Sequence, residues 1–113
     1  MTKPATIIAN RVRYFHYSDE LTFFGWLDRM DIIAGYEGRA DCLHIQLSRQ
    51  PSDEDLRELL AFHERYRIDM RQLAQFETPD NVGWFANPAM YWHESVFGVR
   101  SSSQVEGNAK FRQ

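Results

Sequence analysis

The spacing of hydrophobic positions changes along this 113-residue chain, from every second residue to every third or fourth. Residues 11–17 alternate partly and are rich in aromatic and β-branched side chains, which favours a strand. Ser18-Asp19-Glu20 is typical of a helix N-terminus. Apolar residues then follow at helical spacing, namely Leu21, Phe24, Leu27 and Met30, with Phe23 and Trp26 at the flank. We therefore expect a strand followed by a helix.

Residues 31–37 and 42–48 have the clearest strand patterns. In the second of these, two sets of side chains alternate between opposite faces: Leu43, Ile45 and Leu47, and Cys42, His44 and Gln46. Gly38-Arg39-Ala40-Asp41 supplies a short turn between the two strands. The pattern predicts a β-hairpin.

A second helix is predicted after Pro51, where Ser52 can cap a first turn that holds three acids. Its apolar stripe contains Leu56, Leu59, Leu60, His63 and Tyr66. Asp69 can cap a short third helix that contains Met70, Leu73 and Phe76. Thr78-Pro79-Asp80 predicts a further start, and Asn87-Pro88 ends that helix and begins another.

The order strand, helix, strand, strand, helix, then short helices indicates an α+β fold. We expect a small antiparallel sheet of about three strands, with helices packed on one face and the other face partly open. Residues 1–99 are expected to form a single globular domain. Residues 100–113 are polar and predict a disordered tail or a remnant of the expression vector.

The charge is uneven along the chain. Residues 1–13 carry +3 and residues 100–113 carry +2, while the residues between carry −8 and hold fifteen of the sixteen aromatics. An acidic body argues against direct binding of nucleic acid, because that affinity depends on neutralising phosphates. It instead favours association with a cationic partner.

The single cysteine, Cys42, excludes an internal disulfide and suits a reducing cytoplasm. No apolar run approaches the ~20 residues that a membrane-spanning helix requires, and the N-terminus lacks the pattern of a signal peptide. We therefore expect a soluble, cytoplasmic protein that does not bind membranes.

The sequence contains no glycine-rich phosphate loop, no nucleophile elbow and no two-histidine metal spacing. No cofactor or metal is expected, and the absences favour a protein that is not an enzyme. An alternative is a small enzyme with an acid–base pair, in which His16 and His44 meet across neighbouring strands beside Glu37 or Asp41.

Acidic and aromatic residues supply candidate partner-binding positions. One acidic group lies at the start of the second helix and contains Asp53, Glu54, Asp55 and Glu58. Helix capping with a solvated surface is one interpretation of this group, and a face for a cationic partner is the other. Trp26 and Tyr36 are the proposed aromatic anchors, because such residues are frequent at interface hot spots.

Three segments resemble small single-domain bacterial proteins: residues 23–27, 52–59 and 91–97. In size, acidity and lack of catalytic motifs the chain resembles immunity proteins of contact-dependent and secreted toxin systems. That resemblance implies a binding protein that occludes a cationic, nuclease-type toxin. Besides the small enzyme, a homodimeric regulatory module that uses the open sheet face remains an alternative.

Overall fold

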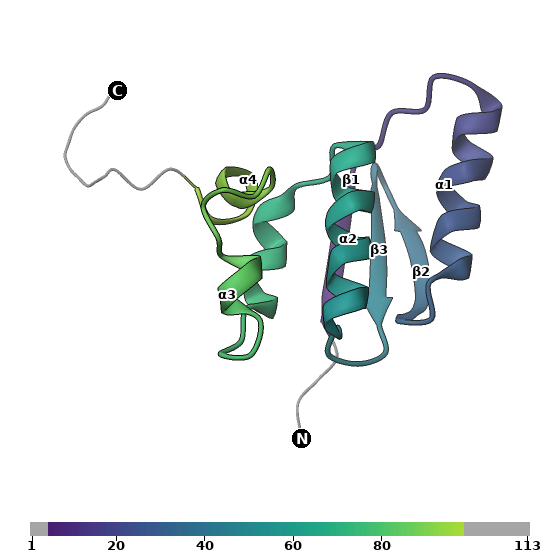
Figure 1. Cartoon of the computed structure of the whole chain (residues 1–113). Helices are drawn as coiled ribbons and strands as arrows, with labels where there is room; N and C mark the ends of the chain where they lie inside the picture. The colour runs from purple at the N-terminus through teal and green to yellow at the C-terminus, as the bar shows by residue number, and fades with distance from the viewer. Residues whose placement is uncertain (1–4, 99–113) are drawn as a thin grey trace.

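The computed structural model describes residues 5–98 and has an α+β architecture, as predicted (Figure 1). A three-stranded antiparallel sheet is followed by helical segments. In chain order the elements are β1 (Thr6–Asn10), α1 (Tyr17–Arg29), β2 (Ile33–Arg39), β3 (Cys42–Leu47), α2 (Asp53–Tyr66), the 3₁₀ helix η1 (Met70–Phe76), α3 (Val82–Phe85) and α4 (His93–Phe97). The predicted tail falls outside the described residues.

The sheet has the strand order β1-β3-β2, with β3 antiparallel to both neighbours. Strands β1 and β2 therefore run in the same direction, and α1 connects them past the central strand. Ile45 pairs with Ile7 on one side and Tyr36 on the other, which places these three side chains on one face. Both α1 and α2 pack against that face.

The first strand lies earlier than predicted. The strand covers Thr6–Asn10, with Ile7 and Ala9 buried, and residues 11–16 form the connection to α1. Arg11 turns the chain away with a φ of 54°, while its N–H still bonds to the Asp41 carbonyl. Pairing with β3 selects the segment that buries apolar side chains, and this overrides the β propensity of residues 11–17.

The predicted hairpin is confirmed. Strands β2 and β3 pair from Ile33 opposite Leu47 to Arg39 opposite Cys42. The turn is shorter than expected, because Gly38 lies within β2 and only Ala40 and Asp41 connect the strands. On β3, Ile45 and Leu47 lie on one face, as predicted, and this face is buried.

Helix α1 differs from its prediction at its cap and in its buried face. His16 caps the helix in place of Ser18, because its Nδ1 accepts the Ser18 N–H at 2.9 Å. The buried residues are Phe23, Leu27 and Met30, whereas Leu21 is 55% exposed. Phe23 is buried because it stacks on Phe62 of α2 and meets the edge of Tyr66.

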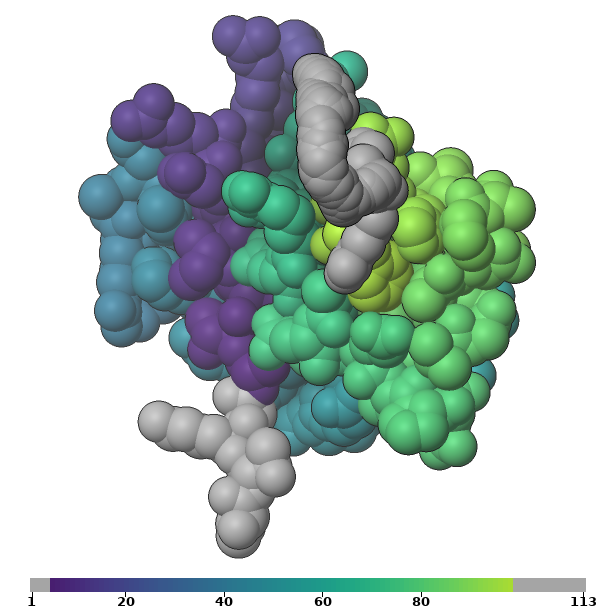
Figure 2. All heavy atoms as spheres, turned by 90° about the vertical axis from the view of Figure 1, so that its left-hand side faces the viewer, coloured from purple at the N-terminus to yellow at the C-terminus, as the bar shows by residue number. Residues whose placement is uncertain are grey.

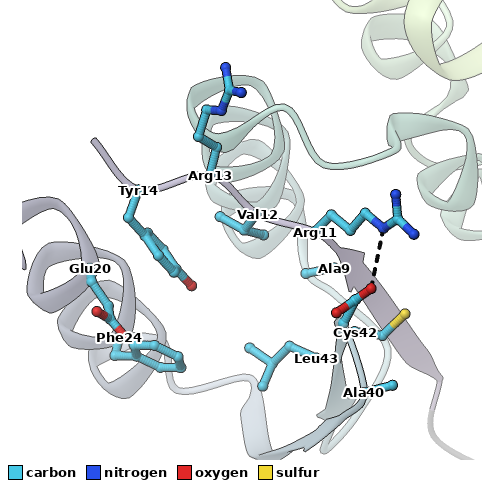
Figure 3. A pocket seen from close by; sticks show the side chains of 11 residues that line it. Ala9, Arg11, Val12, Arg13, Tyr14, Glu20, Phe24, Ala40, Cys42 and Leu43 are labelled. Carbon is cyan, nitrogen blue, oxygen red and sulfur yellow. Dashed lines mark ion pairs between the residues drawn. The ribbon is translucent and has the colours of Figure 1, made fainter. Parts of the chain in front are cut away.

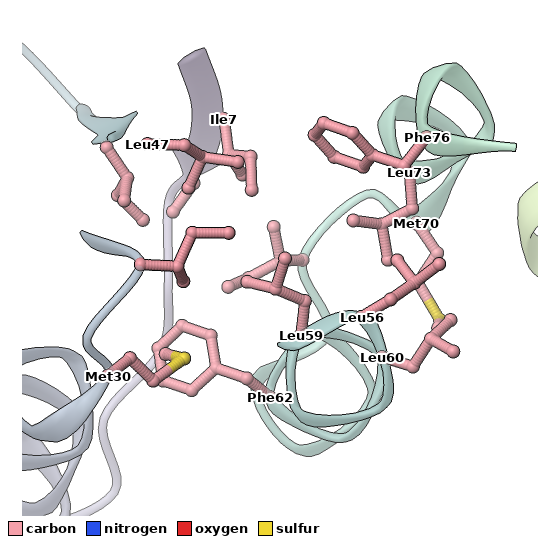
Figure 4. Close-up of a cluster of buried hydrophobic side chains, with 14 of the residues drawn as sticks. Ile7, Met30, Leu47, Leu56, Leu59, Leu60, Phe62, Met70, Leu73 and Phe76 are labelled. Atoms are coloured by element: carbon pink, nitrogen blue, oxygen red, sulfur yellow. The ribbon is translucent and has the colours of Figure 1, made fainter. Parts of the chain in front are cut away.

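Helix α2 follows its prediction closely. Ser52 and Asp55 form a reciprocal capping box, and each accepts the other's backbone N–H. Every residue of the predicted apolar stripe is buried: Leu56, Leu59, Leu60, His63 and Tyr66. Figure 4 shows Leu56, Leu59 and Leu60 of this stripe between Ile7 and Leu47 of the sheet and Leu73 and Phe76 of η1.

The C-terminal third forms short helical segments. Asp69 caps η1, and Met70, Leu73 and Phe76 are buried, as predicted. The next helix begins after Asn81 and not at Thr78, because the side chains of Thr78 and Asn81 bond to each other's backbone N–H and form a turn there.

The outer edge of β1 is covered by a side chain of η1. The Gln72 amide accepts the Ile8 N–H at 2.9 Å and donates to the Ile8 carbonyl at 3.0 Å. These two bonds reproduce those of a neighbouring strand and leave these edge groups satisfied. Figure 2 shows the purple β1 segment beside the green-teal C-terminal half.

The sheet face opposite the helices is polar and partly open. It carries half-buried Cys42, His44 and Gln46 from β3 and exposed Glu37 and Arg39 from β2. Among the described residues, no helix is long and apolar enough to cross a membrane.

Candidate functional site

The predicted partner-binding residues lie at one end of the two-helix layer, where α1 ends and α2 begins. In Figure 1 this is the lower end of both helices. Asp53, Glu54 and Glu58 are exposed on α2, and Trp26 is half-buried on α1. We call this region the acidic end and define it by Trp26, Asp28, Tyr36, Asp53, Glu54 and Glu58.

Trp26 and Glu58 are joined across the two helices. The indole N–H of Trp26 donates to the Glu58 carboxylate at 2.8 Å, while its ring meets the edge of Phe62 at 5.0 Å between centroids. Helix packing thus brings an aromatic anchor and a charged group from positions 32 residues apart into one surface.

Tyr36 makes a similar link on the other side of α1. Its hydroxyl donates to Asp28 at 2.7 Å, and its ring lies 5.5 Å from that of Phe24. The bond to Asp28, together with slight burial and the charge of Asp28, raises the pKa of Tyr36. Tyr36 remains 36% exposed, so its ring edge is available at the surface.

Asp55, in contrast, is engaged within the fold. Its carboxylate accepts the Ser52 N–H and forms an ion pair with Arg49. Burial acts to raise the pKa of Asp55, but the hydrogen bonds from Arg49 and Ser52 outweigh it and lower the pKa. Asp55 therefore stabilises the start of α2 and contributes less to the surface than its neighbours.

The histidines of the enzymatic alternative do not meet. His44 projects from the open sheet face, because it alternates with buried Ile45. His16 caps α1, which packs on the opposite face. Among residues 5–98, no group of three or more His, Cys, Asp or Glu side chains is arranged to hold a metal ion.

A hollow of about 550 Å³ lies between the end of the sheet and the start of α1 (Figure 3). Tyr14, Phe24 and Leu43 form much of its apolar wall, and an Arg11–Asp41 ion pair of 3.4 Å lies at its side. Burial, with a smaller contribution from Glu20, raises the pKa of Tyr14, so its hydroxyl is protonated at neutral pH. In Figure 3 the Arg13 side chain points away from this hollow.

A second, smaller pocket of about 360 Å³ shares Arg11 and Arg13 with the first. We call it the arginine pocket; its lining residues are Arg11, Arg13, Phe15, Arg65, Tyr66 and Arg67. It is formed where α2 ends and the connection into α1 passes by, at the opposite end of the helix layer from the acidic end.

The arginine pocket was not predicted from the sequence. Its signal in the sequence is a pair of Arg-x-Arg triplets, at residues 11–13 and 65–67. Each triplet is unremarkable alone, and more than fifty residues separate them. Only the packing of the 11–16 connection against the end of α2 makes them one site.

Comparisons of the chain with protein-family models, with curated proteins and with solved structures find no match.

Proposed function

We propose that this protein is a non-enzymatic binding protein that recognises a basic protein through its acidic end, in the manner of an immunity protein that occludes a cationic toxin. The observation that supports this most directly is the Trp26–Glu58 hydrogen bond of 2.8 Å. It holds a half-buried indole beside a carboxylate, and this combination can supply both apolar contact and charge to a partner.

The neighbouring charges extend this surface. Asp53 and Glu54 are exposed on the first turn of α2, and Asp28 lies beside Tyr36. Because exposed acids attract a basic partner over long distances, they speed its association more than they strengthen the final complex. The aromatic groups then contribute most to the lifetime of the complex.

The test uses the basic protein encoded by the neighbouring gene. Its dissociation constant and association rate are measured with the wild-type chain and with a triple variant, Asp53→Asn, Glu54→Gln and Glu58→Gln. We expect the triple variant to bind at least about tenfold more weakly, since several charge contacts of ~1 kcal/mol or less are lost together. The loss should shrink at high salt.

A matched control removes three exposed acids elsewhere, with Glu77→Gln, Asp80→Asn and Glu94→Gln. This control should bind nearly as the wild type does. Equal weakening by both variants would show that only net charge matters and would contradict the proposed surface. A neighbouring gene that encodes a metabolic enzyme, with no toxin nearby, would argue against the immunity role.

A further inference from the structure

We propose that the arginine pocket binds a small phosphorylated ligand that carries a planar ring, of the mononucleotide class. The pocket volume of about 360 Å³ lies within the range of small-molecule sites. Four of its six lining residues are arginines, and none of the six is acidic. The guanidinium group matches phosphate with two parallel hydrogen bonds, which a flat surface of lysines does not reproduce.

The charge of the pocket is only partly compensated. Arg11 pairs with Asp41 at 3.4 Å and Arg65 pairs with Asp19 at 3.2 Å. Within residues 5–98, Arg13 and Arg67 have no such partner. The two uncompensated guanidinium groups suit a phosphate monoester, which carries up to two negative charges at neutral pH.

The backbone conformation at this site is unusual. Arg11 and Arg67 have φ values of 54° and 57°, and only Ala40 shares this property among the non-glycine residues that the structure describes. A non-glycine residue in this left-handed conformation costs roughly 1–2 kcal/mol relative to an ordinary backbone conformation. Glycine is the usual residue where a helix ends this way. Arg67 occupies such a position at the end of α2, Arg11 directly follows β1, and both line the same pocket.

An exposed aromatic ring stands at the mouth of the pocket. Phe15 is 79% exposed, and its N–H donates to the Asp19 carboxylate at 3.1 Å, which holds its backbone in place. The guanidinium of Arg13 lies 5.8 Å from the ring centroid. A ring this exposed has room to stack with a planar ligand, as aromatic side chains do with bases.

Tyr66 supplies an independent observation. The residue lines the pocket and is 5% exposed, yet its hydroxyl is buried without a hydrogen-bond partner among the described residues. Arg65 covers the Tyr66 ring at 4.7 Å from its centroid. Buried unpartnered hydroxyls are rare. A residue that lines the pocket thus carries a hydroxyl whose hydrogen bond the described residues do not supply.

The test measures binding of three probes to the full chain by calorimetry: adenosine monophosphate, adenosine and inorganic phosphate. We expect adenosine monophosphate to bind more tightly than either fragment, and its affinity to fall as salt is raised. The double variant Arg13→Gln with Arg67→Gly should weaken its binding at least about tenfold, since two charge-assisted contacts are lost. Glycine at position 67 preserves the local backbone, so folding is retained.

The matched control is Arg29→Gln with Arg39→Gln, which removes the same charge at exposed positions outside the pocket and should leave affinity unchanged. Phe15→Ala should weaken the binding of adenosine monophosphate but leave the binding of inorganic phosphate unaffected. Equal weakening by the control, or no saturable binding of adenosine monophosphate, would overturn the proposal. So would an oligonucleotide that binds far more tightly than the mononucleotide, because that result would assign the site to single-stranded nucleic acid. None of these outcomes involves the acidic end, so they leave the proposed function untouched.

Discussion

The two ends of the helix layer use their charged residues in opposite ways. At the end where α2 begins, Asp55 closes a capping box and so completes hydrogen bonds that the fold needs, while Asp53, Glu54 and Glu58 remain exposed. At the other end, Arg11 and Arg67 occupy left-handed backbone positions around a pocket. Asp55 at the first end stabilises the fold, whereas the left-handed backbone of Arg11 and Arg67 at the second end costs stability.

This difference separates the charges that the fold explains from those that it does not. A charge that satisfies a helix N-terminus is explained by the fold alone. An arginine at a position that favours glycine is not explained in that way. The contrast therefore directs attention to the arginine pocket, although the acidic residues are the more conspicuous feature of the sequence.

The largest effect concerns His63, which is buried on α2. Its Nδ1 donates to the Leu59 carbonyl at 2.7 Å, and the Gln72 amide lies 3.4 Å from its Nε2. Burial lowers the pKa of His63 from 6.5 to about 4, against smaller opposing effects of the Leu59 carbonyl and Asp69. The unfolded chain therefore binds a proton more readily than the folded chain between these two pH values.

The stability of the fold should therefore fall as the pH is lowered through this range. The stabilising contribution is complete above the unfolded pKa of 6.5 and is lost as the pH falls toward about 4. The free energy of unfolding should decrease by about 3 kcal/mol over that interval. Urea unfolding across the interval measures the slope. In His63→Gln the slope should be much shallower, and an unchanged slope would contradict the assignment.

The next effect tests the acidic end as a stabilising region. Asp55→Ala should lower the free energy of unfolding by about 1–2 kcal/mol, because the capping box and the contact with Arg49 are both lost. Urea unfolding monitored by circular dichroism measures the change. Asp53→Ala is the control at an exposed position of the same turn and should cost only a few tenths of a kcal/mol.

The third prediction is a gain in stability and concerns Arg67 of the arginine pocket. Arg67→Gly should raise the free energy of unfolding by about 0.5–1 kcal/mol, because glycine adopts the positive φ of 57° without strain. Arg67→Ala should give no such gain, since alanine keeps the Cβ atom. Thermal unfolding of both variants makes the comparison. Equal stability of the glycine and alanine variants would remove the argument from strain.

The smallest effect separates partner recognition from stability at the acidic end. Glu58→Gln keeps an oxygen that can accept the Trp26 indole, so the free energy of unfolding should change by less than about 0.5 kcal/mol. Binding of the basic partner should still weaken, because the charge is lost. A large loss of stability with unchanged partner binding would assign Glu58 to the fold alone.

Local patterns account for the parts of the fold that were predicted well. The β2–β3 hairpin depends on two adjacent alternating segments, and the start of α2 depends on Ser52 and Asp55, three residues apart. Such features need only neighbouring residues, so the sequence displays them directly. The acids at the start of α2 and the aromatic residues Trp26 and Tyr36 are visible in the sequence, but the hydrogen bonds of Trp26 and Tyr36 are not.

Long-range packing accounts for the parts that were predicted wrongly. The first strand is set by its register against β3, and the buried side of α1 is set by contact of Phe23 with Phe62 and Tyr66. Neither partner is close in sequence. The distribution of charge along the sequence also differs from its distribution in the folded molecule. The sequence has basic ends and an acidic middle, whereas the folded molecule has the acidic end at one end of the helix layer and the arginine pocket at the other.

The sequence by itself determined the α+β class, the hairpin and the capped second helix, because spacing and caps act within a few residues. Only the tertiary structure decided that Arg11 and Arg13 meet Arg65 and Arg67. These two segments are more than fifty residues apart in the sequence. They approach each other because β1 lies in the sheet while α1 and α2 pack on one of its faces. Proximity created in this way has no local signature, which is why the pocket became visible only in the folded chain.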